Sequence, residues 1–296
     1  MIGSDRADKG NRSVEGRFPA PPNLAGIGMS KLSKLMRRRG AGDRYCYLYL
    51  HIAKCAGSSI VARLASLGTQ GIHLSEKCQT KDEARRIFQR KIAVAQQATS
   101  PMQLRVIYGH RVFAGLSAEV PRPTRLLFFM RDPVSMVISL YNYSATIALD
   151  QGHPYHGRER DRMLNGQGQM IHFRDWLDAY APRNLTMSFL YHAVAGELAP
   201  GVSPESFTSE QLDVCKSAVS DAHFVGFVDS IERDGPTLLH MIGVDHAQVK
   251  HENVSKKTFR LSDDPTVRRL VEERNSLDCD LYRFALRERG QRTRAA

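Results

Sequence analysis

Along residues 45–287, short continuous hydrophobic runs alternate with segments whose apolar residues recur at helical spacing. The short runs are typical of strands that are buried on both faces, and the spaced segments are typical of amphipathic helices. The predicted strands cover residues 45–52, 104–108, 124–130 and 223–228. The predicted helices cover residues 58–67, 80–97, 133–148, 173–180, 213–219 and 264–287. This alternation predicts a three-layer α/β fold with a mostly parallel central sheet flanked by helices.

Three segments of the chain lack such a pattern. Residues 1–44 are rich in Gly, Pro, Ser and Arg, and we expect them to form a basic, flexible leader. We expect residues 288–296 to form a basic tail after the folded domain at 45–287. Residues 152–168 are polar, glycine-rich and aperiodic, which predicts a surface loop.

Composition restricts the class of protein. With 296 residues, of which 42% are hydrophobic, the chain can bury a substantial core. No run of 18 apolar residues predicts a membrane span, and the first residues lack the apolar stretch of a secretory signal. The five cysteines are widely spread and include no Cys-x-x-Cys pair. Their spacing argues against a zinc site or a disulfide framework and favours a reducing, cytoplasmic compartment.

The formal charge of +11 is concentrated at the two ends of the chain. Residues 1–44 carry +6 and residues 283–296 carry +4, which leaves only +1 on the region between them. Charged ends of this kind are usually solvated, so we expect no nucleic-acid partner. Residues 29–39 have Leu32, Leu35 and Met36 on one helical face opposite basic residues, and this segment could contact the anionic inner face of a membrane.

The first candidate site follows the strand predicted at 45–52. A loop of small residues around Lys54 leads into a helix for which Ser58 or Ser59 is the expected cap and Gly68 the expected end. Free N–H groups and the positive end of a helix dipole favour an anion at such a place, and Lys54 adds a full charge. The Gly-Lys-Ser/Thr sequence of a nucleoside triphosphate P-loop is missing, so an anion held here is not expected to be bound as ATP–Mg²⁺ is.

The second candidate site follows the strand predicted at 124–130. Arg131 leaves the end of this strand, Asp132 is the expected cap of the next helix, and Pro133 is its first residue. Ser139 lies about two turns along that helix, so a guanidinium group and a hydroxyl could hold one phosphate between them. Taken alone, this segment is better explained as an ordinary corner between a strand and a helix, with Asp132 as the cap and Ser139 as a small residue that the helix tolerates.

Together the two segments resemble the sulfotransferases that use 3′-phosphoadenosine 5′-phosphosulfate (PAPS). The resemblance is to the carbohydrate family that contains the heparan sulfate 2-O-sulfotransferases and their bacterial relatives. HIAKCAGSSI, at residues 51–60, is similar to that family's 5′-phosphosulfate loop, typically HIPKTGGTS. RDPVSMVISLYNY, at residues 131–143, matches its 3′-phosphate motif, and Tyr108-Gly109-His110 matches the element that carries its catalytic histidine. Weaker similarity, including residues 184–190 and 275–285, extends the match over about 45–287.

This resemblance implies a P-loop-like fold and transfer of a sulfuryl group from PAPS to a carbohydrate hydroxyl. Lys54 would neutralise the leaving phosphate, and His110 would be the general base. The implied donor-binding residues are Lys54, Cys55, Ala56, Gly57, Ser58, Ser59, Arg131 and Ser139. No metal is expected, because no acidic metal site accompanies the loop.

The sequence departs from the family pattern at the loop and leaves several residues open. Cys55 stands where the family usually has Thr, so only its backbone N–H is expected to serve the donor. His51 borders the loop and is interpreted as structural. Lys256 and Lys257 could close over the donor or could be solvated. Glu76 and Glu119 are the alternative bases.

Two other classes of function remain open from the residues alone. One is a P-loop kinase or related phosphotransferase with an unusual loop, which is disfavoured because no Lys-Ser/Thr pair closes that loop. The other is a non-enzymatic basic protein associated with membranes or nucleic acids. The nearly neutral central region and the lack of interleaved aromatic and basic residues argue against it.

Overall fold

The computed structural model describes residues 44–74, 80–98, 103–196, 207–244 and 264–295. The strands are β1 (Cys46–Leu50), β2 (Gly71–His73), β3 (Val106–Gly109), β4 (Thr124–Met130) and β5 (Phe224–Phe227). The α-helices are α2 (Gly57–Leu64), α3 (Lys81–Ala98), α4 (Pro133–Leu149), α5 (His156–Met163), α6 (Phe173–Ala179), α7 (Leu185–Val194), α8 (Ser209–Asp221), α9 (Ile231–Ile242), α10 (Pro265–Arg274) and α11 (Ser276–Ala295). Short 3₁₀ helices occur at η2 (Ala65–Gln70), η4 (Ala114–Glu119) and η5 (Val228–Ser230).

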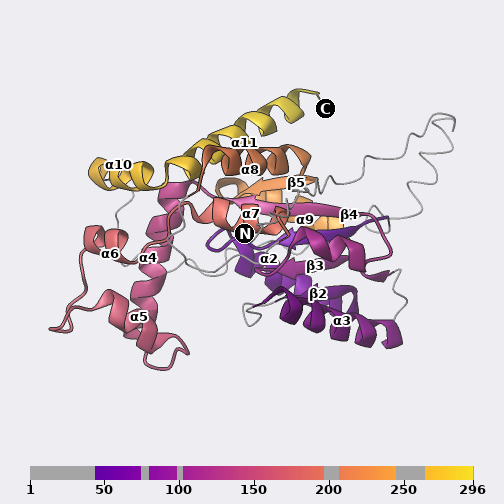
Figure 1. The fold of residues 1–296 in the computed structure, drawn as a ribbon, viewed down its shortest axis with the longest axis horizontal. Coiled ribbons are helices and arrows are strands. Elements are labelled where there is room, and N and C mark those ends of the chain that lie inside the picture. The colour runs from indigo at the N-terminus through magenta and orange to yellow at the C-terminus, as the bar shows by residue number, and fades with distance from the viewer. Residues whose placement is uncertain (1–43, 75–79, 99–102, 197–206, 245–263, 296) are drawn as a thin grey trace, which may run out of the picture. The chain divides into compact units, whose positions relative to one another are not determined.

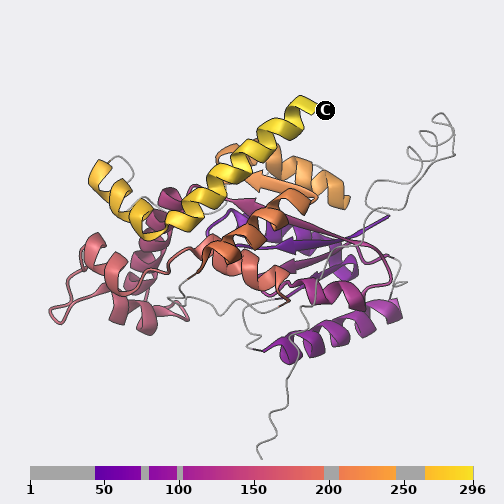
Figure 2. The same cartoon turned by 45° about the horizontal axis from the view of Figure 1, so that its top comes forward.

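The five described strands form one parallel sheet in the order β2-β3-β1-β4-β5. Strand β1 is buried along its whole length, as its continuous hydrophobic sequence predicts. Helices lie on both sides of the sheet, with α8 and α11 side by side on one side and α3 on the other (Figures 1 and 2). The predicted three-layer α/β fold is therefore confirmed.

A second hydrophobic cluster forms away from the sheet, where α4 meets α5, α6 and α10 (Figure 1). The stripe of Val134, Val137, Ile138 and Tyr141 on α4 is buried in this cluster. Trp176 of α6 packs against Tyr141 with a ring-centroid distance of 5.2 Å. One face of α4 is thus fixed by packing that does not involve the sheet.

Two sequence-based predictions about elements were wrong. Residues 152–168 do not form only a loop, because they contain α5, in which Met163 is buried and Glu159 is buried beside Arg158 and Arg162. The single helix predicted at 264–287 is two helices that break at Asn275, whose φ of −124° and ψ of 38° are not helical. Both differences come from long-range burial, which a short window of sequence does not reveal.

The segment predicted as a basic tail at residues 288–296 continues α11 as far as Ala295. Arg289 donates to Ser230 and Asp234, and Arg292 donates to the backbone carbonyls at the end of α8. These bonds fix the end of α11 against α8 and α9. The predicted leader and its segment 29–39 lie outside the described residues.

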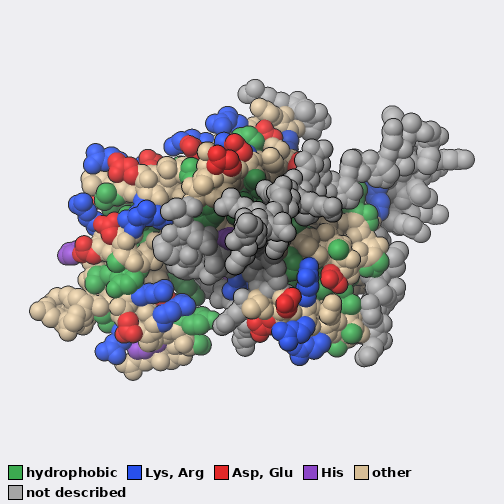
Figure 3. Space-filling model, viewed as in Figure 1, with side chains coloured by type: hydrophobic (Ala, Val, Ile, Leu, Met, Phe, Trp, Pro, Cys, Tyr) green, Lys and Arg blue, Asp and Glu red, His purple; other side chains and the backbone are tan. Residues whose placement is uncertain are grey.

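Charges of both signs are interspersed on the face shown in Figure 3, where Lys and Arg lie among Asp and Glu. No helix among the described residues is long and apolar enough to cross a membrane.

Candidate functional site

The predicted site segments follow three neighbouring strands at one edge of the sheet. Strand β1 lies between β3 and β4, and Leu50 is in register with Gly109 on one side and with Phe128 on the other. His110 follows β3, the Lys54 loop follows β1 and Arg131 follows β4. In open α/β sheets, ligands bind beyond the carboxyl ends of the strands, which is where these segments meet.

The Lys54 loop adopts a strained conformation. Lys54 and Ala56 have φ values of 65° and 57°, in the left-handed region that residues other than glycine rarely adopt. Left-handed residues within a turn are a feature of anion-binding nests, in which backbone N–H groups line a concave surface. Backbone strain held in place by the surrounding structure is typical of ligand-binding sites.

Helix α2 begins at Gly57, and Ala56 is its N-cap. The prediction of Ser58 or Ser59 as the cap was therefore wrong, and both serines lie in the first turn. Ala56 has no side chain that could cap the helix, and N–H groups of a first turn have no acceptor within their own helix. The N-terminus of α2 is thus built to receive an acceptor from outside the helix.

Cys55 differs from its predicted role. Its backbone N–H donates to the carbonyl of Ile52 at 3.2 Å, so this N–H serves the loop itself. The side chain is buried, and burial raises the pKa of the thiol to about 12. Cys55 is therefore a neutral residue that fills space in the core. The first backbone N–H groups that could donate to a ligand at the start of α2 are those from Ala56 onward.

Lys54 places its ammonium Nζ 4.0 Å from the centre of the Tyr143 ring on α4. A cation over an aromatic face is attracted by the negative potential of the ring. Burial, and secondarily the charge of Arg131, lowers the pKa of Lys54 from its usual 10.5 to about 8. Lys54 is thus a desolvated cation, and an anion bound beside it would raise its pKa again. The sequence did not reveal the contact with Tyr143.

Arg131 is joined to the loop. Its Nη1 donates to the backbone carbonyl of Lys54 at 3.1 Å, while its Nε is buried with no hydrogen-bond partner among the described residues. Burial lowers the pKa of Arg131, and Cys55 and Asp229 act in the opposite direction. A partly buried guanidinium with an unused donor fits a strongly acidic ligand such as a phosphate.

The helix that carries Ser139 begins as predicted. Asp132 caps α4 by accepting hydrogen bonds from N and Oγ of Ser135, both at 2.9 Å, and Pro133 is the first residue. Ser139 is partly buried on this helix. No hydrogen bond joins Ser139 to Arg131 as the two residues are described, so the structure brings them to the same strand–helix unit but not into contact.

His110 is held by the turn that follows β3. Gly109 has a φ of 135°, and a Cβ atom there would lie 2.0 Å from the carbonyl oxygen of Leu74, so only glycine fits. Nδ1 of His110 lies 2.5 Å from the carbonyl oxygen of His51, and the two rings stack with centroids 3.9 Å apart. The ring of Phe189 on α7 packs beside the ring of His110, with a distance of 5.6 Å between the ring centroids.

The other predicted residues lie elsewhere. Glu119 is in η4, where its carboxylate lies 3.8 Å from Nε of Arg85. Glu76, Lys256 and Lys257 lie outside the described residues, so their predicted roles remain predictions.

Sequence reasoning missed a buried polar cluster that supports α7. Asp278 of α11 accepts hydrogen bonds from the backbone N–H groups of Thr186 and Met187, each at 2.9 Å. Asn184 donates from its backbone to the side chain of Asn275 at 2.8 Å. Burial raises the pKa of Asp278 to about 6. Asn184 and Asn275 are the first residues of the two segments of weaker family similarity. That similarity was the only sign in the sequence that these segments have a special role.

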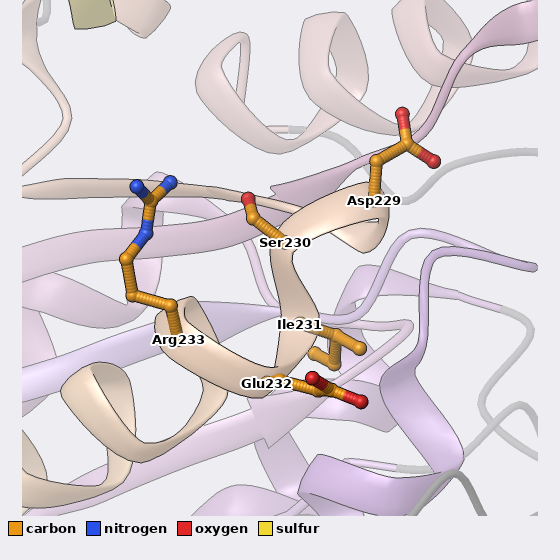
Figure 4. Close-up of a pocket in the computed structure, with 5 residues that line it drawn as sticks. All are labelled: Asp229, Ser230, Ile231, Glu232 and Arg233. Carbon is orange, nitrogen blue, oxygen red and sulfur yellow. The ribbon is translucent and has the colours of Figure 1, made fainter.

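A depression of about 440 Å³ lies beside the site and is lined by residues 229–233, after β5. Ile231 and Glu232 project to one side of this turn, and Asp229 projects to another (Figure 4). Asp229 accepts a hydrogen bond from the hydroxyl of Tyr282 at 3.0 Å. None of the predicted site residues lines this depression.

A model of the sulfotransferase family matches residues 42–285, which include every element from β1 to β5. The chain belongs to the sulfotransferase family. No curated protein matches the chain. As a sulfotransferase it is a transferase, and its reaction class is sulfuryl transfer. No group of three or more His, Cys, Asp or Glu side chains that could hold a metal ion occurs within the part of the chain that the structure describes.

Proposed function

We propose that this sulfotransferase moves a sulfuryl group from PAPS to a hydroxyl of a carbohydrate, with His110 as the general base. The observation that carries this proposal is the convergence of three strand ends. The Lys54 loop is tied to Arg131 on one side through the Lys54 carbonyl, and to His110 on the other through the His51 carbonyl. The residues proposed to bind the donor and the histidine proposed as the base thus lie at one edge of the sheet.

PAPS fits the donor side because it carries two acidic groups at separate positions. The start of α2 and the ammonium of Lys54 are suited to the 5′-phosphosulfate. Arg131, whose buried Nε has no hydrogen-bond partner within the described part of the chain, is suited to the 3′-phosphate, and Ser139 would add a hydroxyl. During transfer, Lys54 would neutralise charge that develops on the departing phosphate, as preorganised cations do in related phosphoryl transfers.

His110 is suited to remove the proton of the acceptor hydroxyl. A backbone carbonyl can only accept, so the bond from Nδ1 to the carbonyl of His51 places the proton of the neutral ring on Nδ1. The lone pair is then on Nε2, where a base needs it. In one step the acceptor oxygen bonds to sulfur, the bond from sulfur to the bridging phosphate oxygen breaks, and the hydroxyl proton passes to Nε2. The carbohydrate acceptor is proposed from the resemblance of the two motifs to carbohydrate sulfotransferases.

Binding and transfer test the proposal in that order. Thermal shift should show stabilisation by 3′,5′-adenosine diphosphate and little by ATP or by a DNA duplex. Sulfate from labelled PAPS should then appear on at least one member of a panel of glycans. Stabilisation by ATP alone would favour a kinase, and stabilisation by DNA alone would favour a nucleic-acid-binding protein. Transfer to phenols or amines in place of glycans would overturn the acceptor class.

A further inference from the structure

His51 contacts both functional halves of the site, although its sequence position at the end of β1 indicates only a structural residue. Its ring stacks on the ring of His110 at a centroid distance of 3.9 Å and an angle of 22°. Its backbone N–H donates to the carbonyl of Gly109 at 3.1 Å, and its own carbonyl accepts from Nδ1 of His110. Three contacts therefore join one residue to the segment that carries the proposed base.

The same ring lies against the start of the donor loop's helix. A Cβ atom placed on Gly57 would lie 1.7 Å from both Cδ2 and Nε2 of His51. The ring therefore occupies the space that a side chain at the first residue of α2 would fill. This contact explains why glycine is needed at position 57, where the backbone conformation itself does not require it.

The His51 ring is suited to this place because it is neutral. Burial, and secondarily the electrostatic influence of His110, His73 and Lys54, holds the pKa of His51 well below its usual range. A neutral flat ring fills the space between the base and the loop without adding a positive charge beside Lys54. It also limits rotation of the His110 ring, because a rotation of either ring would break the stacking contact between them.

We propose that the side chain of His51 is a positioning residue that fixes the ring of His110 relative to the N-terminus of α2, and so aligns the base with the donor. This inference rests on the proposed role of His110. Misplacement of a catalytic group by about 1 Å can cost on the order of 100-fold in rate, so a spacer between base and donor loop has a large effect on turnover.

The experiment compares His51→Ala and His51→Phe, alone and combined with His110→Ala. His51→Ala removes the spacer and should lower kcat by roughly 10- to 100-fold, with less than about a threefold change in Kd for 3′,5′-adenosine diphosphate. His51→Phe retains a flat ring and should lose clearly less. In the His110→Ala background, His51→Ala should cause no further loss, because its effect passes through His110. His223→Ala is the matched control, since this exposed histidine lies at the other end of the sheet, where its ring is tilted against that of Tyr47 at a centroid distance of 6.0 Å.

A second measurement does not depend on turnover. The ¹⁵N shifts of His110 should show the proton on Nδ1 in the wild-type protein and in His51→Phe, and a shift toward the Nε2–H form in His51→Ala. This readout also serves if His51→Ala is too unstable to assay, because the wild-type and His51→Phe spectra alone can contradict the geometry.

Three results would overturn the inference. Wild-type kcat in His51→Ala would show that the ring positions nothing, and additive losses in the double variant would show a general structural effect. An Nε2–H tautomer in the wild-type protein would contradict the bond to the His51 carbonyl. Failure of the proposed function is distinguishable, because the wild-type protein would then neither bind 3′,5′-adenosine diphosphate nor transfer sulfate.

Discussion

The guanidinium of Arg131 donates a hydrogen bond of 3.1 Å to the backbone carbonyl of Lys54. The two residues are 77 positions apart and follow adjacent parallel strands. The bond stabilises a loop whose left-handed residues are costly, and it holds two cations close enough that the charge of Arg131 lowers the pKa of Lys54. Two neighbouring cations repel each other less when an anion is bound between them. The bond from Arg131 to the Lys54 carbonyl thus links the two positions proposed for phosphate before the donor binds.

Removal of the Lys54 charge should affect turnover more than folding. Lys54→Ala should lower kcat by roughly 100- to 1,000-fold, as is typical when one electrostatic stabiliser is removed. Lys216→Ala is a suitable control, because that lysine pairs with Asp213 on α8. Steady-state kinetics with labelled PAPS would measure both. Near-normal turnover in Lys54→Ala would contradict the assignment of the loop to the phosphosulfate.

The lowered pKa of Lys54 predicts the pH dependence of donor binding. Because this pKa is about 8, the free protein loses the ammonium charge as the pH rises through 8. Affinity for 3′,5′-adenosine diphosphate should therefore fall above pH 8 in the wild-type protein. Calorimetric titrations between about pH 6.5 and about pH 9.5, an interval of about one and a half units on either side of this pKa, should show no comparable fall in Lys54→Ala. An identical fall in both proteins would assign the effect to another group.

Arg131 and Ser139 should determine selectivity for the 3′-phosphate. Arg131→Ala should weaken binding of the diphosphate nucleotide by roughly 10- to 100-fold, and Ser139→Ala should weaken it less, because only the arginine contact is between charges. Arg131→Lys keeps the charge but loses the planar fork, so it should recover only part of the affinity.

The selectivity itself is measured as the ratio of Kd values for PAPS and for adenosine 5′-phosphosulfate. This ratio should shrink in Arg131→Ala and in Ser139→Ala. Ser139→Ala is the cleaner of the two variants, because Arg131 also supports the Lys54 carbonyl. Unchanged ratios in both would show that the 3′-phosphate binds elsewhere.

Most of the sheet was predictable from the sequence, since continuous hydrophobic runs identified β1, β3, β4 and β5. Strand β2 has only three residues, Gly71–His73, which is too short for a periodic signal. The start of α4 was predicted because Asp132 and Pro133 act through local chemistry. The cap of α2 was not, because Ala56 adopts a left-handed conformation that its side chain does not favour.

For the candidate site, the sequence predicted which segments meet but not which side chains touch. Strand order brought Lys54, His110 and Arg131 to one edge, and the positions of their motifs at strand ends indicated this. Contacts between distant residues could not be predicted, among them Tyr143 against Lys54 and Asp278 beneath α7. Such contacts depend on how helices pack across the sheet, which the periodicity of a single segment does not encode.

Asp278 should matter for stability through its two backbone hydrogen bonds. Asp278→Asn replaces one accepting oxygen with an NH₂ group that faces a backbone N–H, which should cost about 1–3 kcal/mol of unfolding free energy. Asp280→Asn is the matched control on the same helix, because Asp280 is exposed and forms a surface ion pair with Arg283. Urea denaturation at pH 8 would compare them. Equal stability of the two variants would contradict the structural role of Asp278.

The pKa of Asp278 also predicts how the stability difference changes with pH. Its folded value of about 6 lies above the usual 3.8, so ionisation is disfavoured in the folded protein. The carboxyl therefore contributes more stability as the pH falls from about 6 toward its unfolded value, and less as the pH rises. The corresponding slope in wild-type stability between pH 4 and 6 should be absent from Asp278→Asn. Its persistence would assign the slope to other carboxyl groups.

The central claim is that donor binding and proton removal use separate residues at one edge of the sheet. Transfer of labelled sulfate from PAPS by His110→Ala, measured together with its affinity for 3′,5′-adenosine diphosphate, tests this claim most directly. The account predicts retained affinity, because Lys54, Arg131 and the start of α2 remain, and a loss of roughly 100- to 10,000-fold in transfer. Full transfer activity in His110→Ala, with the nucleotide still bound, would contradict the assignment of the base.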